Sequence, residues 1–91
     1  MSVTWEESTE QKFKKMIEKI LVFLRGVAEE KVGKRAENLA TQDSRSEVTE
    51  KDMVDAFFLE TPFGFQGPMK TDMEDLGIDY VQYGQDRKSV V

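Results

Sequence analysis

The first third of the chain repeats its apolar residues at the spacing of an α-helix. Successive apolar positions are separated by three, one, three, one and three residues, which places them on one face of a helix; they are Phe13, Met16, Ile17, Ile20, Leu21 and Leu24. Thr4 and Glu7 have the spacing of a capping box. The sequence therefore predicts a first helix with Thr4 as its N-cap.

The apolar pattern continues as far as Leu39, and a single helix over that whole length would be long for a small domain. Val22 and Phe23 break the amphipathic rhythm, and each of the two glycines that follow costs about 1 kcal/mol in a helix relative to alanine. We therefore expect a bend near residues 20–23 and a second helix over about 22–40 that lies across the first.

A third helix is predicted after the polar segment 40–47. Thr49 and Asp52 again have the spacing of a capping box. The Thr61-Pro62 pair ends this helix, because the residue before a proline is pushed out of the helical region.

Glycine and proline frame a short fourth helix. Pro68 suits its first position after Gly67 as the cap. Gly77 suits the position just beyond its end, with Ile78 closing the hydrophobic contact of that type of helix end. The following IDYVQYG is expected to be extended and to lie against the body, and residues 86–91 are expected to form a flexible tail.

These elements predict an all-α fold: a small bundle of three main helices with a short C-terminal helix and an extended tail. The length of 91 residues indicates one helical domain, expected over 1–85. The chain contains neither cysteine nor histidine, which excludes zinc sites of the usual Cys/His type, iron–sulfur clusters held by its own thiolates, and the Ser-His-Asp relay. We expect no catalytic residue, metal or cofactor; a small carboxylate- or tyrosine-dependent enzyme is a weaker alternative.

Charge bears on the class of partner. Residues 46–91 carry 10 Asp/Glu against 4 Lys/Arg, and the whole chain has a net charge of −5. An acidic chain repels phosphate backbones at long range, and the basic residues of the first two helices alternate with glutamates. A histone-like nucleic-acid-binding domain is therefore the alternative and not the leading hypothesis.

The N-terminus is acidic and lacks the basic-then-apolar pattern of a signal peptide. No apolar run approaches the roughly 20 residues that span a bilayer. We expect a cytoplasmic protein that is not inserted in a membrane.

Three elements together resemble the small C-terminal domain of the B subunit of light-independent protochlorophyllide reductase. They are Trp5, the segment KILVFLRGVAEEKVGKRA and the segment EVTEKDMVDAF, so the resemblance covers residues 4–58, and 59–85 would be an extension. This chain departs from the family pattern at Leu21, where the family usually has proline, and at Gly33, which replaces a common acidic residue.

The resemblance implies an accessory domain that contacts another protein, with a subunit of a redox or tetrapyrrole enzyme as the partner class. It also makes Arg25 part of a shared pattern. From its position behind five apolar residues, Arg25 could be a snorkelling residue with a structural role or a contact to a partner. Nine aromatic residues in so small a domain favour an exposed apolar patch as a partner site. The predicted partner-binding residues are Arg25, Phe57, Phe63, Phe65 and Tyr80.

Overall fold

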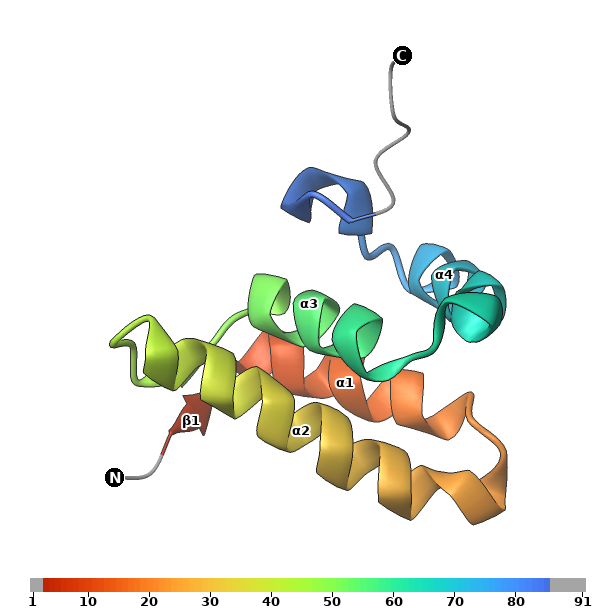
Figure 1. Ribbon diagram of the computed structural model, residues 1–91, viewed down its shortest axis with the longest axis horizontal. Helices are drawn as coiled ribbons and strands as arrows, with labels where there is room; N and C mark the ends of the chain where they lie inside the picture. The colour runs from red at the N-terminus through yellow and green to blue at the C-terminus, as the bar shows by residue number, and fades with distance from the viewer. Residues whose placement is uncertain (1–2, 86–91) are drawn as a thin grey trace.

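Four α-helices joined by short turns make up the described part of the chain, residues 3–85 of the computed structural model, which confirms the all-α fold class (Figure 1). The helices are α1 (Glu7–Glu18), α2 (Arg25–Gln42), α3 (Glu50–Glu60) and α4 (Gln66–Asp75). The 3₁₀ turns are η1 (Val22–Leu24), η2 (Phe63–Phe65) and η3 (Tyr80–Tyr83), and the strands are β1 (Thr4–Trp5) and β2 (Glu47–Val48).

The start of α1 differs from the prediction. Thr4 is not its N-cap, because Thr4 lies in β1 and pairs in parallel with Glu47 of β2. The helix begins at Glu7 instead, after the backbone N–H of Glu6 donates to the carbonyl of Val48 at 3.0 Å. The strand pairing joins segments more than 40 residues apart, so a local capping pattern could not reveal it.

The predicted bend between the first two helices is confirmed, although α2 begins three residues later than expected. The chain leaves α1 at Glu18, passes through η1 and enters α2 at Arg25. Figure 1 shows α2 running back along α1, with α3 packed over the pair.

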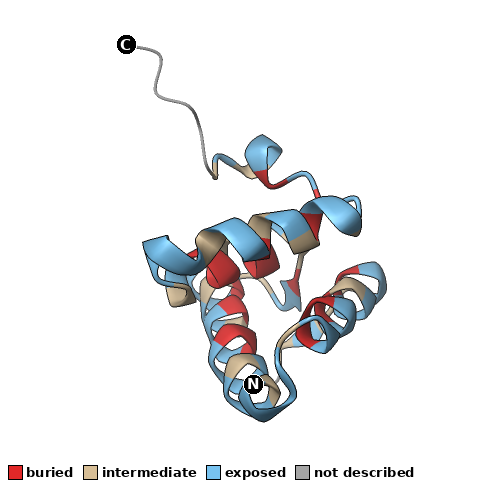
Figure 2. Cartoon of the chain, turned by 90° about the vertical axis from the view of Figure 1, so that its right-hand side faces the viewer, coloured by how far each residue is buried: buried red, intermediate tan, exposed pale blue. Residues whose placement is uncertain are grey.

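The core lies where α3 meets α1 and α2, and Figure 2 shows the buried residues on the sides of the helices that face one another. Its largest fully buried side chains include Met16, Met53, Met73 and Ile78. At the edge of the core, the Trp5 ring stacks on Phe13 with ring centroids 4.8 Å apart.

Short-range signals placed two helix ends correctly. The capping box of Thr49 and Asp52 is present at the start of α3. At the end of α4, Gly77 has a φ of +73°, and the N–H of Ile78 donates to the carbonyl of Met73 at 2.8 Å. This is the expected Schellman ending, with Met73 and Ile78 both buried.

The start of α4 and the segment after it were predicted incorrectly. The η2 turn continues directly into α4, so the helix begins at Gln66 and Pro68 is its third residue. Proline is tolerated there because the first four N–H groups of a helix have no partner within the helix.

The segment after α4 is the 3₁₀ turn η3 and not an extended strand. Side chains fasten it to α3: the Tyr83 hydroxyl donates to Glu50 at 2.8 Å, and Gln85 Nε2 donates to Asp55 at 2.8 Å. Burial and the hydrogen bond to Glu50 raise the pKa of Tyr83 to about 12. The tail predicted over 86–91 lies outside the described residues.

Candidate functional site

Arg25 caps the end of α1. Its Nε donates to the carbonyl of Ile20 at 2.8 Å, and its Nη2 donates to the carbonyl of Glu18 at 2.6 Å. The last carbonyls of a helix have no partner within the helix, so the guanidinium supplies donors that the fold itself needs. The structural interpretation of Arg25 therefore accounts for both of these hydrogen bonds.

Two of the predicted partner-binding aromatics belong to the core. Phe57 is only 2 % exposed, and its ring centroid lies 5.8 Å from that of Phe13. Tyr80 is 7 % exposed, packs on Phe58 and donates its hydroxyl to Glu74 at 2.7 Å. Both side chains are therefore buried in the folded chain, and their role in partner binding stays a prediction. They are buried because helix α3 uses both of its apolar sides, one against α1 and α2 and one against η3.

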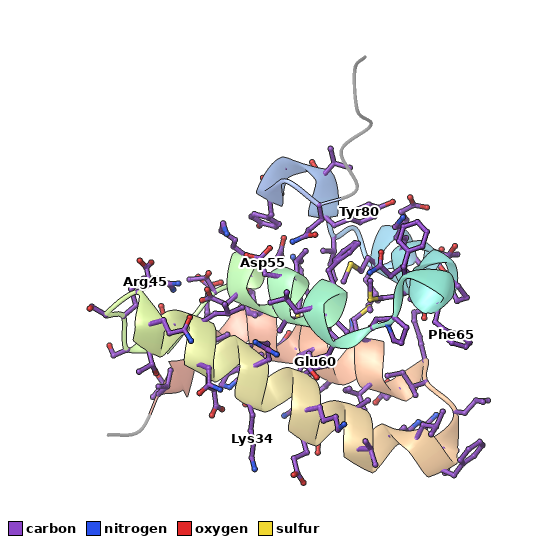
Figure 3. The ribbon with its side chains drawn as sticks, in the orientation of Figure 1. Lys34, Arg45, Asp55, Glu60, Phe65 and Tyr80 are labelled. Carbon is purple, nitrogen blue, oxygen red and sulfur yellow. The ribbon has the colours of Figure 1, made fainter. Side chains whose placement is uncertain are left out.

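The other two predicted aromatics are exposed. Phe63 and Phe65, the first and last residues of η2, are 88 % and 71 % exposed. Figure 3 shows Phe65 at the end of the molecule where α1 turns into α2, well away from Tyr80 and opposite Arg45. Of the five predicted residues, these two remain as surface contacts.

The structure adds a second exposed apolar segment that the site prediction had missed. Residues of the α1–α2 turn and the first turn of α2 leave large parts of their side chains in solvent; they are Leu21, Val22, Phe23, Leu24 and Val27. The break in amphipathic rhythm at Val22 and Phe23 was the available signal, because a stripe that faces only the core would not include them.

The two exposed segments meet at one groove, here called the apolar groove, with a volume of about 520 Å³. One side comes from the α1–α2 turn and the start of α2, including Leu21, Leu24 and Val27. The other side comes from the α3–α4 connection, including Pro62 and Phe65. Its deepest lining residues are core residues, among them Met16, Val32, Phe57 and Met69.

The surface around the groove is almost without charge. Segments 20–28 and 61–69 together contain one charged residue, Arg25, although 34 % of the chain is charged. The guanidinium of Arg25 is bonded to carbonyl oxygens of its own chain. The charged residues that line the groove, here called its rim, lie outside these two segments.

Four charged residues form that rim: Lys19, Lys31, Glu60 and Asp72. Glu60 accepts a hydrogen bond from Arg35 at 2.8 Å, and Lys19 lies 3.6 Å from Asp75. Lys31 on α2 and Asp72 on α4 make no ion pair within residues 3–85. The rim therefore holds one unpaired charge of each sign.

A second hollow of about 410 Å³ lies beside Trp5, between α1 and α2. Its charged side chains are exposed or half-exposed and of both signs, and the indole N–H of Trp5 already donates to Glu37 at 2.9 Å. It contains no buried reactive group.

Most lysine and arginine side chains of the described region pair with carboxylates. The pairs are Lys12–Glu50, Lys19–Asp75, Lys34–Glu30, Arg35–Glu60, Arg45–Asp43, Arg45–Asp52 and Lys51–Asp55. A surface of paired charges is a poor track for phosphates.

Within residues 3–85, no group of three or more acidic side chains is placed to hold a metal ion. Among the helices of this part of the chain, none combines the length and the apolar character needed to cross a membrane.

The fold and the groove thus define a small all-α domain with one phenylalanine-rich end that carries few charges. Comparisons with protein-family models, with curated proteins and with solved structures found no match. The resemblance to the protochlorophyllide reductase domain therefore stays a prediction from the sequence pattern.

Proposed function

We propose that this chain is a non-enzymatic interaction domain that docks on a protein through the apolar groove and the exposed residues beside it. The observation that carries the proposal is the amount of aromatic surface left in water. Phe23, Phe63 and Phe65 are between 71 % and 88 % exposed. With about 150–250 Å² per aromatic side chain, they alone expose roughly 450 Å².

That area already matches the largest apolar patch of a typical monomer, about 300–600 Å², and such patches are often functional. The aliphatic residues of the α1–α2 turn add to it. Leaving this much apolar surface in solvent is unfavourable by about 25 cal/mol for every Å², so a partner that covers it would gain a large driving force.

The composition of this end also supports docking. The centre of a protein–protein interface is depleted in charge and enriched in aromatic residues, and its rim is polar. Segments 20–28 and 61–69 have that composition, and Lys19, Lys31, Glu60 and Asp72 have that position.

The backbone at Leu21 could accommodate the proline of the family pattern. Its φ of −53° lies in the range that a proline ring imposes, and proline is the residue the family usually has there. The resemblance suggests a subunit of a redox or tetrapyrrole enzyme as a protein to test for docking.

A photo-reactive amino acid in place of Phe63 tests the proposal in the cells that make this protein. We expect a discrete cross-linked product, because Phe63 is 88 % exposed and its chain neighbours Pro62 and Phe65 line the groove. The matched control places the same group at Val81, which is 50 % exposed but lies on η3, away from the groove. Equal labelling from both positions, or no product from position 63, would rule out the groove as a docking site.

A further inference from the structure

We infer that the partner seated on the apolar groove is a second copy of this chain, in a two-fold symmetric dimer. The inference rests on the proposed function for the choice of surface and goes further by naming the occupant. Three features of the same surface support it: its area, its shape and the charges on its rim.

The exposed area fits a standard interface. Stable interfaces bury about 800 Å² on each partner. The three phenylalanines contribute roughly 450 Å², and Leu21, Val22, Leu24 and Val27 lie beside them with about half or more of their side chains exposed. A second copy would bring an equal apolar area to the contact.

The shape is self-complementary. In a two-fold interface the same patch occurs on both partners, so it must contain both the projecting groups and the hollow that receives them. Phe65 and Leu21 line the hollow of about 520 Å³ and are 71 % and 64 % exposed. Each copy can therefore insert aromatic side chains into the groove of the other.

The rim charges are also arranged for a second copy. Lys31 and Asp72 line the same groove from α2 and α4, and neither has an ion pair within residues 3–85. Two-fold symmetry makes every contact reciprocal: if Lys31 of one copy meets Asp72 of the other, the reverse contact forms as well. A partner with charges of one sign would satisfy only one of the two residues.

The test is the molar mass of the purified chain, measured by light scattering behind a sizing column over a wide range of concentrations. We expect a reversible dimer. Phe63→Glu should abolish it, because dimer formation would bury one carboxylate per copy next to Pro62 and Phe65 of the groove. Val81→Glu, at a matched exposed position outside the groove, should dimerise like the parent. Thermal unfolding followed by circular dichroism checks that both variants fold.

Reversal of the rim charges identifies the contacts. Lys31→Glu and Asp72→Lys should each raise the dimer dissociation constant about tenfold or more, since each places like charges opposite one another twice. The double variant restores opposite charges and should return the dissociation constant close to that of the parent. Two impaired single variants with no recovery in the double variant would overturn the assigned pairing.

A chain that stays monomeric at every concentration would overturn the inference, and so would a dimer that Phe63→Glu leaves intact. The cross-linking experiment separates this failure from that of the proposed function. A monomer whose position 63 cross-links to a different protein would keep the docking site and reject the second copy as its occupant. A monomer without any such product would reject both.

Discussion

The side chain of Arg25 reaches back over the turn and donates its Nε hydrogen to the carbonyl oxygen of Ile20, 2.8 Å away. The arginine that looked most like a binding residue in the sequence thus holds the α1–α2 turn closed. Val22 and Phe23 lie in this turn and are 74 % and 78 % exposed.

Replacing Arg25 with alanine is expected to lower the free energy of unfolding by about 1–3 kcal/mol, because two charge-assisted hydrogen bonds to helix-end carbonyls are lost. Denaturant unfolding followed by circular dichroism measures the change. Arg25→Lys keeps one cationic donor and should lose less. Unchanged stability in the alanine variant would show that the cap contributes little, and would return Arg25 to the list of partner contacts.

The carboxylate of Asp52 binds Arg45 in a two-pronged contact, with Nη1 to Oδ2 at 2.8 Å and Nη2 to Oδ1 at 2.7 Å. Burial raises the pKa of Asp52, but the hydrogen bonds from Arg45 and Thr49 outweigh it and leave the pKa below its usual value. The pKa of Asp52 in the folded chain therefore lies below its pKa in the unfolded chain, which is about 3.9. Ionised Asp52 therefore contributes to the free energy of unfolding above about pH 4. This contribution is lost as the pH falls through the pKa of Asp52 in the folded chain.

Asp52→Asn should lower the free energy of unfolding by about 2–3 kcal/mol at pH 7. Below about pH 4, the free energy of unfolding of this variant should fall less steeply with pH than that of the parent. Unfolding curves at several pH values measure both effects. Asp43→Asn is the matched control, since Asp43 binds the same guanidinium at 2.7 Å but is largely exposed. It should change stability by less than about 1 kcal/mol. If the free energy of unfolding depends on pH in the same way in the parent and in Asp52→Asn, the lowered pKa of Asp52 is not the cause of the loss of stability at low pH.

Phe57 and Phe63 should respond oppositely to truncation. Phe57→Ala leaves a cavity in the core and is expected to cost about 3–5 kcal/mol. Phe63→Ala removes an exposed ring and should change the stability of the monomer by no more than about 0.5 kcal/mol. Denaturant unfolding at low protein concentration, where a dimer dissociates, measures both. Similar losses in the two variants would mean that Phe63 is packed against the body.

Ser44 occupies a backbone position that glycine prefers. It follows the end of α2 with a φ of +58°, and its neighbour Arg45 closes a Schellman motif by donating its N–H to the carbonyl of Ala40 at 2.9 Å. Ser44→Gly is expected to raise the free energy of unfolding by about 0.5–1 kcal/mol, since glycine adopts this conformation without a steric penalty.

The reverse change at the end of α4 provides the control. Gly77→Ser puts a side chain at a φ of +73° and should lower stability by a similar amount. Thermal unfolding of both variants measures the opposite shifts. A loss of stability in Ser44→Gly would indicate that the serine hydroxyl makes a contact the fold depends on.

Several helix ends could be predicted from the sequence because they depend on contacts within about six residues. The capping box at Thr49 needs only Asp52, three positions on, and the Schellman ending at Gly77 needs only Met73 and Ile78. The all-α class and the bend after α1 follow in the same way from the spacing of apolar residues.

Contacts between distant segments were not predictable, and they decide the candidate site. The pairing of Thr4 with Glu47 displaced the start of α1, and the packing of η3 on α3 buried Tyr80. Whether an aromatic side chain becomes core or surface depends on which other element covers it, and local spacing contains no such information.

By itself, then, the sequence determined the all-α class and some of the helix ends, what chemistry its residue types exclude, and that the chain is rich in aromatic residues. Only the tertiary structure decided that Phe57 and Tyr80 lie inside, that Phe23, Phe63 and Phe65 lie outside, and that Phe65 lines one groove. The physical reason is that helix formation is governed by neighbours along the chain, whereas burial is governed by neighbours in space.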